Sequence, residues 1–476
     1  MWYKYVTRRL ATQVAQAWNF GWGDAMEKVY KVSVKNTLVF RDQNKTEYYV
    51  DLAQHKKYVF YLYKLLKNPR FIKSFHQQAQ EELENILEDT QKIFGDKNFS
   101  KLSNNELLKI YEDFVLPNVE QFYIRMWMVF NIGEPLANTV KKRLTKYISP
   151  EKVDGYLLTL SSPLLPNDVL NERSDLLKIA AQKDKLTAGR LKTKIKKHTA
   201  KYQHIPMFDF DHDPYNEKHF FDEFLKIINP QKELRELKEL FASRKKDFNK
   251  ILNNLKLDKQ FIYLLKFLKE NVYLRDYRDM IRQKLNLELR SFYLEIGKRL
   301  ALSIDEVATL TNKEIIFCLS KNVKFSKQEV QKRELSYLLI QKGNKYKIYS
   351  GQDAISRANK ELKFEKIKKV KVVKGIVGSS GRARGRAKIV YTNKDLHKVK
   401  KGDVLVSTMT RQDFVVAIRK SVALVTDEGS VTAHAAIIAR ELKIPCIVAA
   451  KIATKVFKDG DLLEVDAYNG IVTKLE

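Results

Sequence analysis

The sequence contains little cysteine, few prolines and no long apolar run. Only two cysteines, Cys318 and Cys446, occur among 476 residues, and they lie far apart in the chain. This argues against a disulfide framework and against a cysteine-based metal cluster. No segment reaches the roughly 18 consecutive apolar residues of a membrane helix. The first residues also lack the apolar core and cleavage site of a signal peptide. These absences predict a cytoplasmic protein without a membrane partner.

Helix-breaking residues are missing from the middle of the chain. No glycine occurs between Gly189 and Gly297, and no proline occurs between Pro230 and Pro445. Long stretches without breakers that are rich in Leu, Lys, Glu, Tyr and Phe are typical of helices. Residues 1 to about 330 are therefore predicted to be mainly α-helical. The helices are expected at 48–67, 73–94, 105–130, 175–181, 216–228, 231–255, 258–301 (long enough to be broken) and 304–309.

A few short strands are expected within this helical part and after it. Residues 37–41 and 47–50 predict small β elements. Residues 336–341 and 345–349 predict a hairpin, because Gly343 between them permits the positive φ of a tight turn.

The composition changes near residue 370. Eight of the 17 glycines fall in the last 106 residues, where short β-branched runs alternate with turns. This alternation is typical of a compact α/β domain. Four parts are predicted: a helical region 1–150, a second helical region 151–330, a connecting hairpin, helix and hinge 331–370, and an α/β domain 371–476. The α/β domain is expected to have strands at 387–391, 403–407, 423–426, 446–449, 462–466 and 471–474, with helices at 414–420 and 433–442.

The net charge of +31 suggests a polyanionic partner, but its distribution does not favour nucleic acid. Residues 371–476 contain 19 Lys/Arg against 11 Asp/Glu, and residues 1–370 contain 69 against 46. The density of positive charge is similar in both parts, so neither part is a basic tail or domain. An anionic small molecule or an acidic protein is the better prediction, with nucleic acid the weaker alternative.

His434 lies in the most informative segment, Gly429-Ser-Val-Thr-Ala-His-Ala-Ala-Ile-Ile-Ala-Arg-Glu-Leu. A turn of small residues leads into a helical pattern, and the imidazole lies in its first turn. Backbone N–H groups there have no helical partners, and the helix dipole adds positive charge, so the position binds anions. The same field disfavours the imidazolium and keeps the ring nucleophilic. A neutral imidazole at an anion site is suited to accept a phosphoryl group.

The same segment resembles a known family. The sequence Thr432-Ala-His434-Ala-Ala, followed by Ala439-Arg-Glu-Leu and Ile444-Pro, is similar to the phosphohistidine "swivelling" (mobile) domain of phosphoenolpyruvate-utilising enzymes. That family includes phosphoenolpyruvate synthase, pyruvate phosphate dikinase and rifampicin phosphotransferase. The resemblance covers roughly residues 372–476. It implies a swivelling β/β/α fold and a role for His434 as the carrier of a phosphoryl group between two distant sites.

Residues beside His434 are given roles by their types and by this resemblance. Thr432 is predicted to cap the helix and, from the resemblance, to lie near the phosphoryl group. Gly429 and Ser430 form the turn in which the backbone approaches a phosphate. Arg440 and Glu441 are adjacent on the helix and point in different directions, which favours structural support over catalysis.

Two other segments contain ligand-type residues. Residues 375–385 are rich in glycine, but no strand–loop–helix unit frames them and no Lys-Ser/Thr pair follows, so a nucleotide site is not predicted. They resemble the opening hairpin of the swivelling domain. Asp209, Asp211, His212 and Asp213 alternate in a way that divalent ions use. Because no glycine turn or closing glutamate follows, a capped loop is predicted here, and no metal site.

The helical part resembles, more weakly, the helical domain of rifampicin phosphotransferase-like proteins. The similar segments are 160–163 with 171–177, 205–223, 273–280 with 293–300, and 311–314. The resemblance implies that residues 151–330 hold the acceptor substrate. Full-length relatives also have an ATP-grasp domain that phosphorylates the histidine. Neither its glycine-rich lid nor its alternating sheet pattern is found here, so a separate polypeptide is expected to supply it.

The predicted function is that of a phosphotransferase component. An ATP-grasp partner would bind Mg-ATP and phosphorylate His434, while this chain itself would hold no tightly bound cofactor. A hinge at 361–374 would let the domain carry the phosphoryl group to a small-molecule acceptor. His204, His212 and His219 are the candidate bases for that acceptor. The alternative is a non-catalytic regulatory or scaffold protein that retains the swivelling fold.

Overall fold

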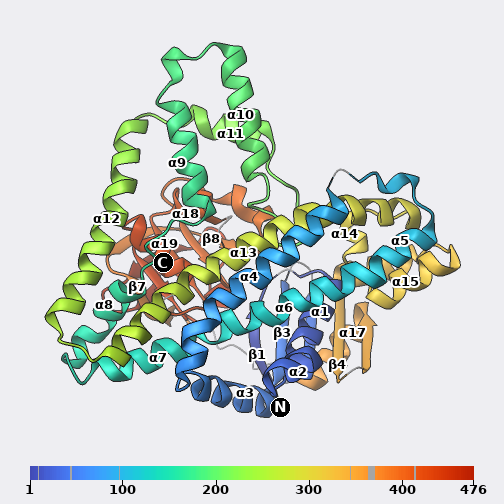
Figure 1. Ribbon diagram of the computed structural model, residues 1–476, viewed down its shortest axis with the longest axis horizontal. Helices are drawn as coiled ribbons and strands as arrows, with labels where there is room; N and C mark the ends of the chain where they lie inside the picture. The colour runs from blue at the N-terminus through green and yellow to red at the C-terminus, as the bar shows by residue number, and fades with distance from the viewer. Residues whose placement is uncertain are drawn as a thin grey trace. The chain divides into compact units, whose positions relative to one another are not determined.

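The chain is described by a computed structural model and folds into two compact units (Figure 1). The sheet unit comprises Met1–Tyr58, Thr309–Asn312 and Phe325–Glu476, and the helical unit comprises Val59–Ala308 and Lys313–Lys324. The boundaries predicted at 150, 330 and 370 follow composition rather than contacts, and they stay predictions. The structure describes residues 1–475 except Arg9, Gln43, Asn44, Asp96, Asn344, 363–369, Gln412, Asp413 and Thr432, and except the side chains of Asn393 and Lys394.

The helical unit is organised around α13 (Lys259–Leu300), a continuous helix of 42 residues. The side chain of Asp258 caps its start by accepting the Phe261 N–H at 2.8 Å. No glycine or proline interrupts it before Gly297, so the break allowed for in the prediction does not occur. Helix α4 (Pro69–Phe94) packs along it (Figure 1).

Most predicted helices are confirmed, with some shifted bounds. The predicted helix 105–130 is divided by a π-helical turn at Tyr111–Val115, next to Pro117, which has no N–H for the helical ladder. Of the helices in the described part of the chain, none is long and apolar enough to cross a membrane. The remaining helices that lie wholly or partly in the helical unit are α3 (Leu52–Leu65, which begins in the sheet unit), α5 (Asn104–Ile110), α6 (Leu116–Asn131), α7 (Gly133–Leu144), α8 (Pro150–Ser161), α9 (Asp168–Ala180), α10 (Ala188–Tyr202), α11 (Glu217–Leu225), α12 (Pro230–Asn254), α14 (Ile304–Val307) and α15 (Asn312–Lys321).

The sheet unit contains a five-stranded antiparallel sheet whose strands come from residues 2–51 and 336–350. Its order is β1-β3-β2-β4-β5, so β1 lies at an edge. The strands are β1 (Trp2–Thr7), β2 (Asn36–Asp42), β3 (Lys45–Asp51), β4 (Ser336–Lys342) and β5 (Lys345–Ser350).

This sheet confirms some predictions and corrects others. The predicted hairpin is present as β4 and β5, and Gly343 has a φ of 57°. Strand β1 was not predicted. The helix expected from residue 48 is wrong for residues 48–51, because this aromatic and β-branched run pairs with strands on both sides. The first 150 residues are therefore less uniformly helical than predicted.

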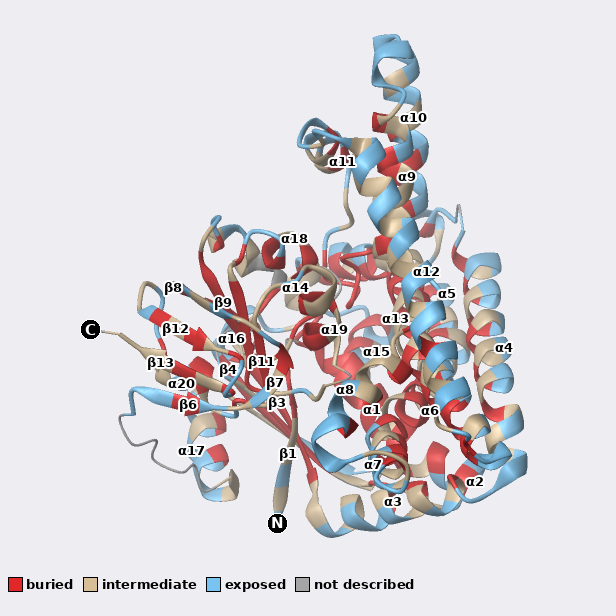
Figure 2. Ribbon diagram, turned by 90° about the vertical axis from the view of Figure 1, so that its left-hand side faces the viewer, coloured by how far each residue is buried: buried red, intermediate tan, exposed pale blue. Residues whose placement is uncertain are grey.

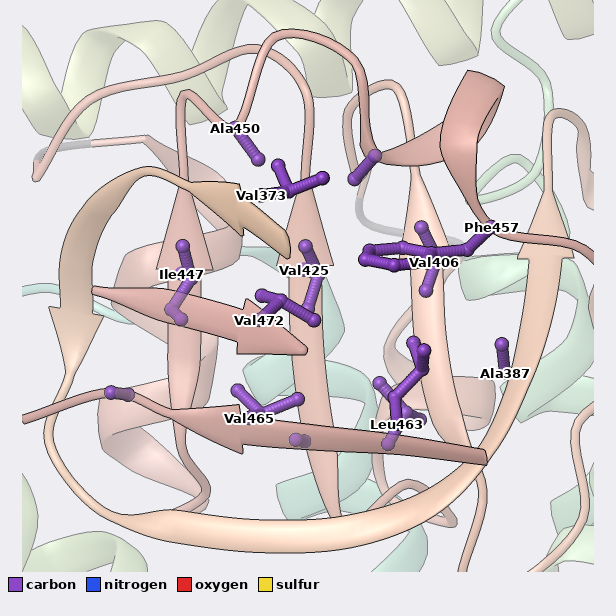
Figure 3. Packing of buried hydrophobic residues seen from close by; sticks show 14 of the residues in the cluster. Val373, Ala387, Val406, Val425, Ile447, Ala450, Phe457, Leu463, Val465 and Val472 are labelled. Atoms are coloured by element: carbon purple, nitrogen blue, oxygen red, sulfur yellow. The ribbon is translucent and has the colours of Figure 1, made fainter. Parts of the chain in front are cut away.

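The α/β domain contains an eight-stranded sheet of order β6-β13-β12-β8-β9-β10-β11-β7. Its core strands β9, β10 and β11 are fully buried (Figure 2). Valine, isoleucine, leucine and alanine side chains from these strands and from β12 and β13 form one core (Figure 3). The strands are β6 (Val372–Lys374), β7 (Ile376–Ser379), β8 (Arg382–Val390), β9 (Val404–Ser407), β10 (Ala423–Thr426), β11 (Cys446–Val448), β12 (Leu462–Asp466) and β13 (Ile471–Lys474).

The strands predicted from residue 403 onward are confirmed within one residue, whereas the strand predicted at 387–391 begins at Arg382, β6 and β7 were not predicted as strands, and the opening hairpin is wrong. Strand β7 pairs with β11, whereas β8 pairs with β9 and β12. Glycine is needed at position 378 on β7, since an added Cβ would lie 3.0 Å from Ala436 Cβ.

The other helices of the sheet unit are α1 (Thr12–Phe20), α2 (Met26–Tyr30), α16 (Lys327–Leu335), α17 (Gly351–Leu362), α18 (Val415–Ile418), α19 (His434–Glu441) and α20 (Ala453–Val456).

Candidate functional site

His434 is the first residue of helix α19, which follows strand β10 in the α/β domain. The N-cap residue is Ala433, in an extended conformation with a ψ of 156°, and no side-chain cap accompanies it. The cap therefore lies one residue after Thr432, the position predicted for it, and Thr432 itself lies outside the described residues. His434 thus lies in the first turn of a helix, where the backbone N–H groups have no helical partners, as the sequence predicted.

Thr410 orients the imidazole of His434. The Thr410 Oγ1 and His434 Nδ1 atoms share a hydrogen bond across 3.0 Å. Thr410 follows strand β9, whose neighbour in the sheet is β10, so two adjacent strand ends bring the two side chains together. No role was predicted for Thr410 from the sequence, because nothing local to residue 410 indicates a partner 24 residues away.

We expect Thr410→Val to slow phosphate uptake at His434 by about five- to tenfold, which corresponds to one neutral hydrogen bond. The substitution removes the hydroxyl but keeps the branched shape, so the fold should be retained. The rate would be measured by following intact mass over time with a saturating phosphoryl donor. A rate equal to that of the unchanged protein would show that the hydroxyl does not orient the ring.

Gly429 and Ser430 form the tight turn that the sequence predicted before the helix. Gly429 has a φ of 122°, a region that residues with a side chain rarely adopt. An added Cβ would also lie 3.1 Å from Ala433 Cβ. The Ser430 carbonyl accepts the Ala433 N–H at 2.9 Å, which closes the turn. Their role in phosphate binding remains a prediction.

Arg440, near the C-terminal end of α19, donates hydrogen bonds to the helix and to the loop before His434. Its Nε donates to the Ala436 carbonyl at 2.6 Å, and its Nη2 donates to the Val431 carbonyl at 2.5 Å. The guanidinium therefore ties the loop before His434 to the helix that follows it. This geometry agrees with a supporting role for Arg440. Glu441 is the last residue of α19, and its supporting role remains a prediction.

Glu428 precedes the turn and is a titrating group that the sequence reasoning missed. Burial raises the pKa of Glu428 to about 7, and the nearby Asp427 adds to this, against smaller opposing effects of Lys4 and the Thr7 N–H. Burial raises the pKa of Tyr49 on strand β3, and the charge of Glu428 adds to this. A carboxyl with a raised pKa favours the folded state while it is protonated.

We expect this effect to make the sheet unit less stable as pH rises. The contribution of Glu428 is full below its unfolded pKa of 4.5 and is lost as pH rises through about 7. Between pH 5 and pH 8 the free energy of unfolding should fall by about 1–3 kcal/mol from this group. Urea unfolding of the protein and of Glu428→Gln at both pH values would test this. An identical pH dependence in the two proteins would contradict the assignment.

The three histidines predicted as acceptor-side bases lie in the helical unit. His204 Nε2 is 2.9 Å from the Asp168 carboxylate, and His212 Nδ1 is 2.9 Å from the Pro206 carbonyl. Burial lowers the pKa of His219. Each ring thus has a local environment that can be structural, and their role as bases remains a prediction.

The structure brings Asp209, Asp211 and His212 together, with their possible ligand atoms within 4.8 Å of one another. However, Arg282 Nη2 lies 2.8 Å from Asp209 Oδ1, and both side chains are buried. A guanidinium at this distance already supplies positive charge to the carboxylate and repels a cation. We therefore assign the cluster to the packing of the loop against α13.

The segment that contains His434 matches a known protein family. Residues 399–470 match the family "PEP-utilising enzyme, mobile domain". A probable phosphoenolpyruvate synthase of Archaeoglobus fulgidus is 48% identical over 101 residues, which are 21% of this chain and 13% of that protein. The phosphoenolpyruvate synthase of Pyrococcus furiosus is 47% identical over 103 residues, 22% of this chain and 13% of that protein.

These matches define the extent of the similarity. The chain spans about 13% of the length of these curated relatives, so the similarity concerns the α/β domain and not the whole enzymes. Among solved structures, Thermococcus kodakaraensis aconitase X aligns at a TM-score of 0.19 with 21% identity, over 22% of this chain and 98% of that chain. A score this low identifies no fold.

Proposed function

We propose that the mobile domain in this chain is the phosphoryl carrier of a phosphotransferase, with His434 as the residue that is transiently phosphorylated. The observation that carries the proposal is the position of His434 at the start of α19, with Nδ1 bonded to Thr410. Because Nδ1 is engaged in this bond, we assign Nε2 as the nucleophilic nitrogen. The similarity to phosphoenolpyruvate synthases over this domain supports the same chemistry.

The carrier reaction has two steps. In the first, His434 Nε2 attacks a phosphorus atom of ATP, a P–N bond forms, and the P–O bond to the nucleotide leaving group breaks. In the second, an acceptor hydroxyl attacks the same phosphorus, the P–N bond breaks, and a base takes the hydroxyl proton. A phosphoramidate suits this sequence because it forms and breaks readily, which divides one transfer into two.

The proposed partners follow from this scheme. A separate ATP-grasp protein would bind Mg-ATP, whose metal neutralises phosphate charge. The helical unit would hold a small-molecule acceptor. The first helical N–H groups of α19 would bind the phosphoryl oxygens, and Gly429 would let the backbone approach them.

The test is phosphate uptake by the purified chain. It would be incubated with Mg-ATP, alone and with ATP-grasp proteins of the same source, and its intact mass would be measured after acid and after base treatment. We expect one acid-labile, base-stable phosphoryl adduct that needs the ATP-grasp protein. No adduct with any of these proteins would contradict the carrier role and favour the regulatory or scaffold alternative.

A further inference from the structure

Strand β1 offers backbone groups at the edge of the five-stranded sheet. It pairs with β3 on one side and ends that sheet on the other. An edge strand presents N–H and C=O groups that can bind another segment. At Thr7, the last residue of β1, the N–H donates to Glu428 Oε2 at 3.4 Å, and the carbonyl accepts from Thr408 Oγ1 at 3.3 Å. Two side chains of the α/β domain therefore satisfy both main-chain groups of one edge residue.

A charge interaction accompanies these two hydrogen bonds. Lys4 on the same strand places its Nζ 3.7 Å from Glu428 Oε1 and 3.9 Å from Glu47 Oε1. The ammonium thus lies between a carboxylate of its own sheet and a carboxylate of the α/β domain. The Lys4 side chain is 31% exposed and that of Glu428 is 20% exposed, whereas the Glu428 Oε1 atom itself is buried, so the contact is partly buried.

The two sheets have separate apolar cores. The core of the α/β domain draws all its members from residues 373–472 (Figure 3). The cluster under the five-stranded sheet draws its members from residues 2–362. The hydrogen bonds at Thr7 and the ion pair at Lys4 are polar contacts that lie outside both cores. Contacts of this kind hold two bodies together by only a few-fold each in an equilibrium constant, so they can be released without unfolding either core.

The contact is made by the same two loops that build the His434 site. Glu428 directly precedes Gly429, and Thr408 lies two residues before Thr410, which bonds to the His434 ring. The residues that contact β1 therefore lie one or two positions along the chain from residues that shape the His434 site.

We infer that the end of strand β1 is a docking site for the α/β domain, which binds the domain through Thr408 and Glu428 in one resting position of its swivelling motion. The inference rests on the proposed function, since a carrier domain must leave one position to reach another. Recognition is through backbone atoms of Thr7, so the side chain of Thr7 is not required. Release of the contact frees the two loops that position His434.

Docking can be measured by single-molecule energy transfer in the full chain. One dye would be placed at Tyr468→Cys, which is 68% exposed in the α/β domain, and the other at Lys347→Cys on the exposed face of β5. The native cysteines, Cys318 and Cys446, are both buried and should label poorly. The variants are Lys4→Ala, Thr408→Val and Glu428→Ala.

We expect one dominant distance in the unchanged protein, which is the docked state. Each variant should lower the ratio of docked to undocked molecules by about three- to tenfold, the effect of one polar contact. Lys4→Ala is informative because it lies outside the α/β domain and cannot disturb the fold around His434. Lys56→Ala, an exposed lysine of the same unit on α3, is the matched control and should leave the ratio unchanged.

Two results would overturn the inference: a broad distance distribution in the unchanged protein, or the same distribution in all three variants. The measurement needs no phosphate, so it is independent of the proposed function. Docking as expected without any phosphohistidine would contradict the carrier role and leave the docking site standing. Phosphohistidine formation with unaltered distances in the variants would support the carrier role and overturn the docking site.

Discussion

His434→Gln is expected to abolish stable phosphate uptake by the chain. Glutamine has a similar length and can hydrogen-bond to Thr410, but its amide has no basic nitrogen to form a phosphoramidate. Loss of a nucleophile commonly lowers the rate by at least about a thousandfold, so the adduct should fall below detection. Intact mass after incubation with Mg-ATP and the ATP-grasp partner would measure the loss.

The matched control for this variant is His397→Gln. His397 is an exposed histidine of the same α/β domain, in a short 3-10 helix at Asn393–Lys398. It should keep full phosphate uptake. An adduct that persists in His434→Gln but disappears in His397→Gln would place the carrier nitrogen elsewhere and contradict the assignment.

Arg282→Met is expected to destabilise the helical unit by about 3–5 kcal/mol. Arg282 and Asp209 form an ion pair at 2.8 Å, with side chains that are 2% and 0% exposed. Methionine fills a similar volume but leaves the Asp209 carboxylate buried without its cation. Removing one partner of such a pair costs more than removing both, because the remaining charge cannot be solvated. Urea unfolding followed by far-UV circular dichroism would measure the change in the free energy of unfolding.

A double variant separates the loss of charge pairing from the loss of packing. Arg282→Met with Asp209→Leu should recover most of the lost stability, since neither charge is then buried alone. A double variant as unstable as Arg282→Met would show that packing of the arginine stem, and not the charge, dominates. An effect of Arg282→Met below about 1 kcal/mol would contradict the ion-pair argument altogether.

The sequence by itself determined the local features of the site. The strands predicted at 423–426, 462–466 and 471–474 coincide with β10, β12 and β13, because short β-branched runs between turns favour the extended conformation. Gly429 lies in the turn and His434 begins the helix five residues later, so this short segment alone predicted a helix start after a glycine turn. The length of α13 likewise follows from the missing helix breakers.

The tertiary structure alone decided which distant segments meet. Strand β2 pairs with β4 over some 300 residues of chain, and the edge strand β1 binds Glu428. Thr410 reaches His434 only because β9 and β10 are neighbours in the sheet, and Arg282 reaches Asp209 only because a loop folds onto α13. Local sequence sets the conformation of each segment. Pairing between segments depends on packing between residues that are distant in the sequence. The neighbours of a residue along the chain therefore do not reveal its partner.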